Sequence, residues 1–573
     1  MRIFPVPGAP KRPGLFVPMK PPYFHLLGGA LCFALGALTM RAADPAPVTV
    51  PMLRAAQELL GLRFTEAQLD SAREDVAGYR NDYEANRKVA LPNSVAPATV
   101  FNPVPSTWQP APAAGNDKLP KLPKVSLPAN REDLAFYSVR QLGELLRTRQ
   151  ISSEDLTRFC LDRLKRYDPR LLCVTTLTEE LALQQARAAD ADIRRGKYRG
   201  PLHGIPYGIK DLFSTKGYKT TWGSVPYKDQ VLDEDAAVVV RLREAGAVLC
   251  AKLTLGELAM GDVWYGGRTR TPWNLEKGSS GSSAGSASAV AAGLLPFTIG
   301  TETLGSIVSP STACGVTGLR PSFGRVSRAG AMALSWTMDK IGPIARSAED
   351  CAVVFDALLG PDRRDPATML VPADFRYTFD ADVKKLRVGY LRADFERQYP
   401  NKANDEASLA TLRKLGVELV PLELPPLPAN DILYLLTVEG AAAFDELTRS
   451  GRDQLMVNQG RNAWPNVFRG SRFVPAVEYL QAQRHRTLLI EEMARRLQGF
   501  DAYVAPSFGR NLVVTNLTGH PAVALPNGFT KEGLPQTITF TGALFEEGKL
   551  LALARAYQQA TDFDEKRPPL ALR

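Results

Sequence analysis

From residue 136 onward, short apolar runs of strand type alternate with longer stretches of helical period. Ser138 and Gln141 have the spacing of a capping box at the start of this region. One later unit is a helix over AAVVVRLREAG, which Asp235 could cap and Gly246 end, followed by the strand AVLCA. Another runs from the strand LRVGYL through the helix EASLATLRKLG to the strand VELVPL. Such alternation predicts an α/β domain with helices on both sides of a sheet.

The N-terminal end has a different pattern. Four basic residues precede the apolar run HLLGGALCFALGALTM, and no acidic residue occurs before Asp44. About 15 apolar residues are short for a membrane span and typical of a signal-peptide core. We therefore expect residues 1–43 to be a signal peptide or an N-terminal membrane anchor. The expected location is the periplasm or the exterior, with a membrane tether if the segment is not cleaved.

A separate extension is expected over residues 44–135, before the main domain at 136–573. Residues 51–88 form a charged, amphipathic stretch of helical period, and the segment from Pro92 to Pro128 is rich in proline with little periodicity. This pattern indicates a helical extension followed by an extended strap. Two interpretations are equally consistent with this pattern. The extension could be an arm that packs on the domain or mediates a homodimer, or it could be a passive linker.

Composition narrows the function classes. The net charge of +10 is mild for 573 residues, and basic and acidic residues are interleaved without a basic stripe, so no nucleic-acid partner is expected. There is no HExxH, no CxxC and no carboxylate cluster at ligand spacing, so no metal or other cofactor is expected. Outside the leader, five cysteines without metal-type spacing are expected to be buried free thiols.

The most informative segment runs from Lys277 to Val308, with the sequence KGSSGSSAGSASAVAAGLLPFTIGTETLGSIV. Two turns rich in glycine and serine are joined by a helix of small residues and a short apolar strand. Small residues suit places where the backbone passes close to another group or takes an unusual φ. A flexible linker is the alternative, but the helix and strand that follow favour a built site.

A serine nucleophile in this segment has few imidazoles available, because the chain contains four histidines. A lysine can act as the base instead, if burial lowers its pKa enough to make it neutral near pH 7. Lys210 in LHGIPYGIKDLF has an apolar setting, with Gly204 and Gly208 permitting close backbone approach. A solvated surface lysine is the alternative interpretation.

These motifs occur in the order of a known family. They are GIPYGIKD around Lys210, TPWN, GSSAGSASAVAAG from Gly281, GTETLGSI from Gly300, ACGVTGLRPSFGRVSRAG and DKIGPIARSAEDCA. Over roughly residues 136–570 the chain resembles the amidase signature family, serine hydrolases with a Ser-Ser-Lys triad. The resemblance implies an α/β fold with a large mixed sheet of about eleven strands.

The resemblance also implies roles for individual residues. Ser306 would be the acyl nucleophile, Ser282 the bridging serine and Lys210 the base, with a cis peptide bond before Ser282. Gly281 and Ser283 would support this loop.

The backbone N–H groups of Thr303, Leu304, Gly305 and Ser306 would form the oxyanion hole, whose donors are each typically worth about 100-fold to 1,000-fold in rate.

Four positions depart from the family pattern. The family commonly has Asp at the position of Glu302, Gly at Leu304, Arg at Val308 and Gly at Ala284. If that Asp and Arg form an ion pair, both of its members have changed here, which indicates a rearranged support for the loop. These changes affect the expected shape of the oxyanion loop and the substrate preference.

The predicted function is hydrolysis of a small carboxylic amide to a carboxylate and an amine or ammonia. One alternative is the glutamine-hydrolysing component of a tRNA-dependent amidotransferase, its A subunit, which the predicted leader disfavours. Another is a non-catalytic binding or scaffold protein on the same fold. Specificity is expected from residues 434–473, where Trp464, Phe468 and Phe473 could line a pocket or, as we slightly favour, fill the core.

Overall fold

The computed structural model describes residues 46–108, 122, 124–372, 374–377 and 381–569. The leader predicted at 1–43 lies outside these residues. The described chain forms two compact units, one ending at Ala90 and one beginning at Leu91, and each is described by itself.

The first unit contains two helices, α1 (Val50–Leu59) and α2 (Glu66–Asn86), in the region where the sequence predicted a helical stretch at residues 51–88. The chain breaks after α1 because Gly61 adopts a left-handed φ of +68°. Thr65 then starts α2 with a capping box, in which its hydroxyl accepts from the Gln68 N–H and the Gln68 side chain accepts from the Thr65 N–H.

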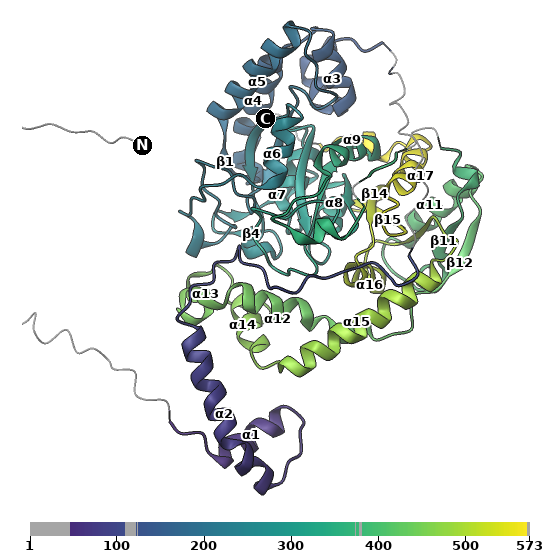
Figure 1. The fold of residues 1–573 in the computed structure, drawn as a ribbon. Helices are drawn as coiled ribbons and strands as arrows, with labels where there is room; N and C mark the ends of the chain where they lie inside the picture. The colour runs from purple at the N-terminus through teal and green to yellow at the C-terminus, as the bar shows by residue number, and fades with distance from the viewer. Residues whose placement is uncertain (1–45, 109–121, 123, 373, 378–380, 570–573) are drawn as a thin grey trace, which may run out of the picture. The chain divides into compact units, whose positions relative to one another are not determined.

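The second unit is built on one mixed sheet, which confirms the predicted α/β fold with eleven strands (Figure 1). The strand order is β1-β3-β2-β8-β10-β9-β14-β15-β13-β11-β12. The strands are β1 (Val174–Leu177), β2 (Pro206–Lys210), β3 (Val248–Leu253), β8 (Phe297–Glu302), β9 (Thr317–Arg320), β10 (Lys340–Ala345), β11 (Val388–Leu391), β12 (Leu419–Leu422), β13 (Ala502–Pro506), β14 (Ala522–Phe529) and β15 (Pro535–Gly542).

Parallel and antiparallel pairings are combined in this sheet. Strand β2 lies parallel to both β3 and β8, while β8 pairs with β10 in the antiparallel sense. Every residue of β2, β3 and β8 is buried. Strands that are buried on both faces are mainly apolar, and the polar residues of these three strands include Lys210 and Glu302 of the site described below. Two small hairpins lie outside the sheet, β4 (Val263–Trp264) with β5 (Gly267–Arg268) and β6 (Arg270–Thr271) with β7 (Asn274–Gly278).

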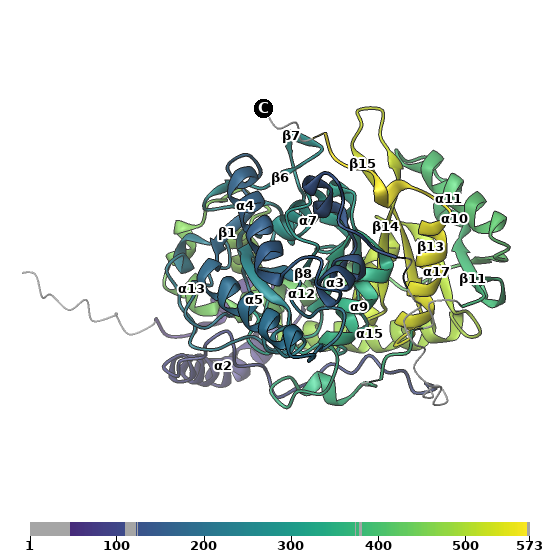
Figure 2. The same cartoon turned by 90° about the horizontal axis from the view of Figure 1, so that it is seen from above.

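Helices lie on both sides of the sheet (Figure 2). They are α3 (Val139–Arg147), α4 (Ser153–Leu171), α5 (Glu179–Arg194), α6 (Ala237–Glu244), α7 (Ala284–Ala291), α8 (Val308–Cys314), α9 (Ala348–Leu358), α10 (Arg392–Glu396), α11 (Lys402–Lys414), α12 (Tyr434–Ala443), α13 (Asp445–Arg449), α14 (Trp464–Ser471), α15 (Ala476–Arg496), α16 (Arg510–Thr518) and α17 (Glu547–Gln559). The two that position the site are α7, between β7 and β8, and α8, directly after β8.

Two predicted caps had different outcomes. The capping box of Ser138 and Gln141 is present at α3, with both reciprocal hydrogen bonds. The predicted cap of α6 by Asp235 is wrong, because Ala236 precedes the first helical residue. The Asp235 carboxylate instead accepts from the Lys216 N–H at 2.9 Å.

The strap, defined here as residues 91–108, is extended and contains no helix or strand. The Asn93 side-chain amide accepts from the Ala333 N–H at 2.7 Å and donates to the Ala333 carbonyl at 2.8 Å. Further along, the ring of Phe101 lies 3.5 Å from the Arg486 guanidinium carbon. The strap therefore packs on the domain and is not a passive linker.

Candidate active site

Lys210, the last residue of β2, is fully buried. Its ammonium nitrogen Nζ lies 2.8 Å from Ser282 Oγ, 3.2 Å from Ser283 Oγ and 2.8 Å from Thr301 Oγ1. Within the described chain it has no carboxylate partner at ion-pair distance. Burial lowers the pKa of Lys210 to about 7, although the charges of Asp339 and Glu302 oppose this effect. A lysine with such a pKa is substantially neutral at physiological pH and can accept a proton.

Ser282 lies in the turn between β7 and α7, and the peptide bond between Gly281 and Ser282 is cis, as the resemblance implied. A Cβ atom at Gly281 would lie only 1.8 Å from the carbonyl oxygen of Gly261, so the turn has no room for a side chain there. Ser283 fastens the turn to β8, because its hydroxyl accepts from the Thr301 N–H at 3.1 Å and donates to the Thr301 carbonyl at 3.0 Å.

Ser306 follows β8 and precedes α8, and its relative exposure is 8%. The Ser283 N–H donates to the Ser306 carbonyl at 3.2 Å, which holds the two serine-bearing turns together. Among the described residues, the hydroxyls of Ser282 and Ser306 do not hydrogen-bond each other. The structure thus brings Lys210 and Ser282 into direct contact and places Ser306 on the adjoining turn.

The segment from Thr303 to Ser306 presents free backbone donors. Within the described residues, these four N–H groups have no carbonyl or side-chain acceptor. Gly305 has a φ of +84°, and a Cβ atom there would lie 3.2 Å from Leu512 Cδ2. Unpaired N–H groups in one turn are what an oxyanion hole requires.

Glu302 shows how the departures from the family pattern are accommodated. Its carboxylate accepts from the backbone N–H groups of Ile307 at 2.8 Å and Val308 at 3.0 Å, at the start of α8. It also forms a fully buried ion pair with Arg320 at 2.7 Å and accepts from Asn516 at 2.9 Å. Burial acts to raise the pKa of Glu302, but Arg320 and these donors outweigh it and hold the pKa at about 2. The cation that the family commonly carries at position 308 is thus supplied by β9.

Several contributing residues were not predicted. Thr301 contacts Lys210, and Asp339 accepts a hydrogen bond of 2.6 Å from the Thr303 hydroxyl. Both occur in motifs recognised from the sequence, GTETLGSI and DKIGPIARSAEDCA, so a signal was present for them. Arg320 occurs in the motif ACGVTGLRPSFGRVSRAG, but its pairing with Glu302 could not be read from that motif, because the pairing depends on the packing of β9 and α16 around β8.

The aromatic residues expected near a specificity pocket divide into two groups. Trp464 and Phe468 are buried and stacked on each other, with ring centroids 5.0 Å apart, so the expectation that they fill the core is confirmed. Phe473 is 67% exposed and fills neither core nor pocket. The five cysteines outside the leader are buried free thiols, as expected.

Two further properties concern only the described part of the chain. It contains no cluster of three or more histidine, cysteine, aspartate or glutamate side chains placed to hold a metal ion. None of its helices is both long and apolar enough to cross a bilayer.

The eleven-stranded sheet and the lysine-serine arrangement together define the class of hydrolases that use a Ser-Ser-Lys triad. A family model described as Amidase matches residues 155–512. The chain belongs to the amidase family, hydrolases of carbon-nitrogen bonds in amides.

Two kinds of relatives accompany this match. The A subunit of the glutamyl-tRNA(Gln) amidotransferase of Acinetobacter baumannii (strain AYE) is 34% identical over 490 residues, covering 77% of this chain and 99% of the relative. The native peptide amidase from Stenotrophomonas maltophilia is 31% identical, with a TM-score of 0.67, covering 75% of this chain and 98% of that one. An amidase family protein from Bacillus anthracis str. Ames is 28% identical, with a TM-score of 0.69, covering 76% and 93%.

Proposed function

We propose that the chain hydrolyses a small carboxylic amide through an acyl-enzyme on Ser306. Neutral Lys210 accepts the proton of Ser282, and Ser282 accepts the proton of Ser306 as its oxygen attacks the amide carbonyl. The N–H groups from Thr303 to Ser306 stabilise the negative oxygen that forms. Return of the proton to the nitrogen breaks the carbon-nitrogen bond and releases the amine, and water then hydrolyses the ester on Ser306.

The observation that carries this proposal is the contact of 2.8 Å between Lys210 Nζ and Ser282 Oγ in a fully buried setting. A charged lysine without a carboxylate partner is costly to bury, so the site favours the neutral form that the mechanism requires.

The test uses a fluorophosphonate, which needs no knowledge of the substrate. Attack by Ser306 forms an oxygen-phosphorus bond and expels fluoride, and peptide mass spectrometry locates the adduct. We expect labelling at Ser306 in the wild type and in Lys219→Ala, an exposed lysine on the same segment. Labelling should disappear in Lys210→Ala. A folded wild-type protein that gives no adduct at Ser306 across a pH series would exclude the mechanism.

A second candidate function is glutamine hydrolysis within a tRNA-dependent amidotransferase, in the role of its A subunit. The 34% identity to the glutamyl-tRNA(Gln) amidotransferase relative favours it. The purified chain can be assayed with glutamine alone and after affinity isolation from its own cells. Release of ammonia from glutamine together with recovery of further subunits would favour this candidate, whereas turnover of simple amides by the isolated chain would favour the first.

The scaffold alternative depended on the changes at Glu302, Leu304 and Val308. Glu302 is not an unpaired buried charge, because Arg320 neutralises it at 2.7 Å. The oxyanion loop therefore has a complete support, which favours catalysis over a binding role. The labelling experiment discriminates the two.

We also propose that the protein is exported, on the strength of the apolar run that precedes Asp44. Cell fractionation, with N-terminal sequencing of the mature protein, tests this. A new N-terminus near residue 43 in the exported fraction would support cleavage, and an intact N-terminus in the membrane fraction would support a tether. Recovery of full-length protein from the cytoplasm alone would contradict export.

A further inference from the structure

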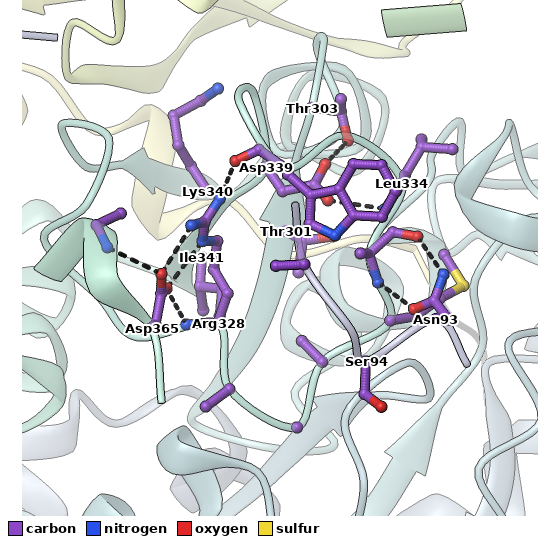
Figure 3. A pocket seen from close by; sticks show the side chains of 18 of the residues that line it. Asn93, Ser94, Thr301, Thr303, Arg328, Leu334, Asp339, Lys340, Ile341 and Asp365 are labelled. Carbon is purple, nitrogen blue, oxygen red and sulfur yellow. Dashed lines mark hydrogen bonds and ion pairs between the residues drawn. The ribbon is translucent and has the colours of Figure 1, made fainter. Parts of the chain in front are cut away.

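A cavity of about 120 Å³ is lined by the strap together with residues of β8, β10 and the segment before β10 (Figure 3). Thr301 and Thr303 line it, and both belong to the site already described. Thr301 Oγ1 is 2.8 Å from Lys210 Nζ, which is in turn 2.8 Å from Ser282 Oγ. This part of the cavity wall is thus two hydrogen bonds away from the bridging serine.

The remaining walls are mainly apolar. They come from the segment before β10, from β10 itself and from the strap, and include Ala329, Ala331, Met332, Leu334, Ile341 and Val100. An apolar wall next to a reactive polar group is the usual construction of a small-molecule site.

The charged groups at this cavity already have partners in the protein. Arg328 is paired with Asp365, at 2.7 Å for the shortest contact, and also donates to the Trp336 carbonyl. Asp339 accepts from the Thr303 hydroxyl and from the N–H groups of Leu334 and Ser335. With these charges engaged, the surface left for a ligand is mostly apolar.

The strap completes the cavity on its outer side. Asn93 is fixed to Ala333 by two hydrogen bonds, and Phe101 is packed on Arg486. Residues 91–108 lie outside the segment matched by the family model, 155–512. This wall is therefore supplied by the N-terminal extension.

We propose that this cavity is a subsite of the active site that takes a short apolar group of the amide substrate, a proposal that rests on the proposed function. An apolar cavity of about 150 Å³ holds one benzene molecule, so a cavity of about 120 Å³ suits a group of roughly four or five carbons, such as isobutyl. Small polar amides and long acyl chains are poorer substrates on this basis.

The first test compares fluorophosphonates that carry methyl, isobutyl or dodecyl groups, with labelling of Ser306 measured over time. We expect isobutyl to react about 10-fold or more faster than methyl, because burying a few carbons in a fitted pocket is typically worth that much, and faster than dodecyl. Equal rates for the three probes would overturn the subsite. Absence of labelling by every probe would instead overturn the proposed function.

The second test fills the cavity from within. Ala331→Leu should lower the isobutyl rate by about 10-fold to 100-fold and the methyl rate by no more than about threefold. Ala556→Leu, at a partly exposed alanine on α17 that does not line the cavity, is the matched control and should change neither. The proposal is contradicted if Ala331→Leu lowers the isobutyl and methyl rates equally, or if it lowers neither rate.

A third variant makes the test independent of overpacking. Leu334→Ala enlarges the cavity, and the preferred probe should change from isobutyl to benzyl; an unchanged preference counts against the subsite.

Two amide series then show which side of the substrate enters the cavity. Primary amides from acetamide to isovaleramide vary the acyl group, and N-alkylacetamides vary the amine. A preference for about four carbons in either series supports the subsite, and a flat response in both overturns it.

Discussion

At the scale of single residues, the site depends on one lysine kept out of water. Lys210 contacts the hydroxyl oxygens of three side chains, and among the described residues no carboxylate lies at ion-pair distance from it. Its lowered pKa is therefore a property of its position at the end of a buried strand.

The first prediction concerns pH. Because the pKa of Lys210 is lowered to about 7, the neutral base is lost as the pH falls below that value. We expect the rate of Ser306 labelling to fall about tenfold per pH unit below 7 and to level off above about 8. In Lys210→Arg the guanidinium stays protonated, so labelling should be absent at every pH. A flat profile for the wild type would show that Lys210 is not the base.

The second prediction concerns Glu302. Glu302→Gln leaves the fully buried Arg320 without its carboxylate, which should lower the free energy of unfolding by about 3 to 5 kcal/mol. Denaturant titration measures the loss. Glu302→Gln with Arg320→Met should recover part of it, because no unpaired charge remains. Glu446→Gln breaks an exposed ion pair with Arg452 and serves as the control, with an expected loss below about 1 kcal/mol.

At the scale of elements, the Glu302 carboxylate connects strand β8 to helix α8. The last residue of the strand binds the first N–H groups of the helix, so the turn between them is held at both ends. The four free N–H groups of that turn are consequently fixed in direction before any substrate arrives. This is the preorganisation that oxyanion stabilisation needs.

The third prediction tests that turn. Gly305→Ala should lower the labelling rate of Ser306 by about 100-fold, because φ is +84° and the new methyl group meets Leu512 at 3.2 Å. Gly196→Ala is the matched control, since φ is +78° there with no atom within 4 Å of the added methyl. The control should lose about 1 kcal/mol of stability and keep its labelling rate. Equal labelling by the two variants would contradict the role given to Gly305.

The elements also show what could be read from the sequence. Lys210, Ser282 and Ser306 belong to short motifs whose local patterns are specific, so the contact between Lys210 and Ser282 and the position of Ser306 on the adjoining turn were predictable. The pairing of Glu302 with Arg320 and Asn516 joins β8, β9 and α16, and no local pattern shows which side chains of these elements meet. The predicted α6 cap was wrong because the helix begins one residue later than expected, after Ala236, and Asp235 accepts instead from the Lys216 N–H of another segment.

At the scale of the whole molecule, buried carboxyls link stability to pH. Asp350 joins two helices, because its side chain accepts from the Val139 N–H of α3 while the residue itself lies in the first turn of α9. Burial raises the pKa of Asp350 to about 7. The native state thus keeps a proton that the unfolded chain releases near pH 4.

The fourth prediction follows from this difference. Because the native pKa is the higher one, the stability contributed by protonated Asp350 is complete below about pH 4 and is lost as the pH rises through about 7. Asp350→Asn removes the titration, so its free energy of unfolding relative to the wild type should rise between pH 5 and pH 8, by on the order of 3 kcal/mol. Denaturant titrations at both pH values measure this. Asp431→Asn, at an exposed site, should show no such change, and the same result for Asp350→Asn would contradict the assignment.

One consequence of the Glu302 network reaches protein engineering. The Glu302 carboxylate binds position 308 through its backbone N–H, and the positive charge that balances Glu302 comes from Arg320. A charged side chain at position 308 is therefore not needed. Any residue other than proline supplies that N–H. Position 308, two residues beyond the proposed nucleophile, is therefore a place where apolar side chains of similar volume can be exchanged in a library while the oxyanion loop keeps its shape.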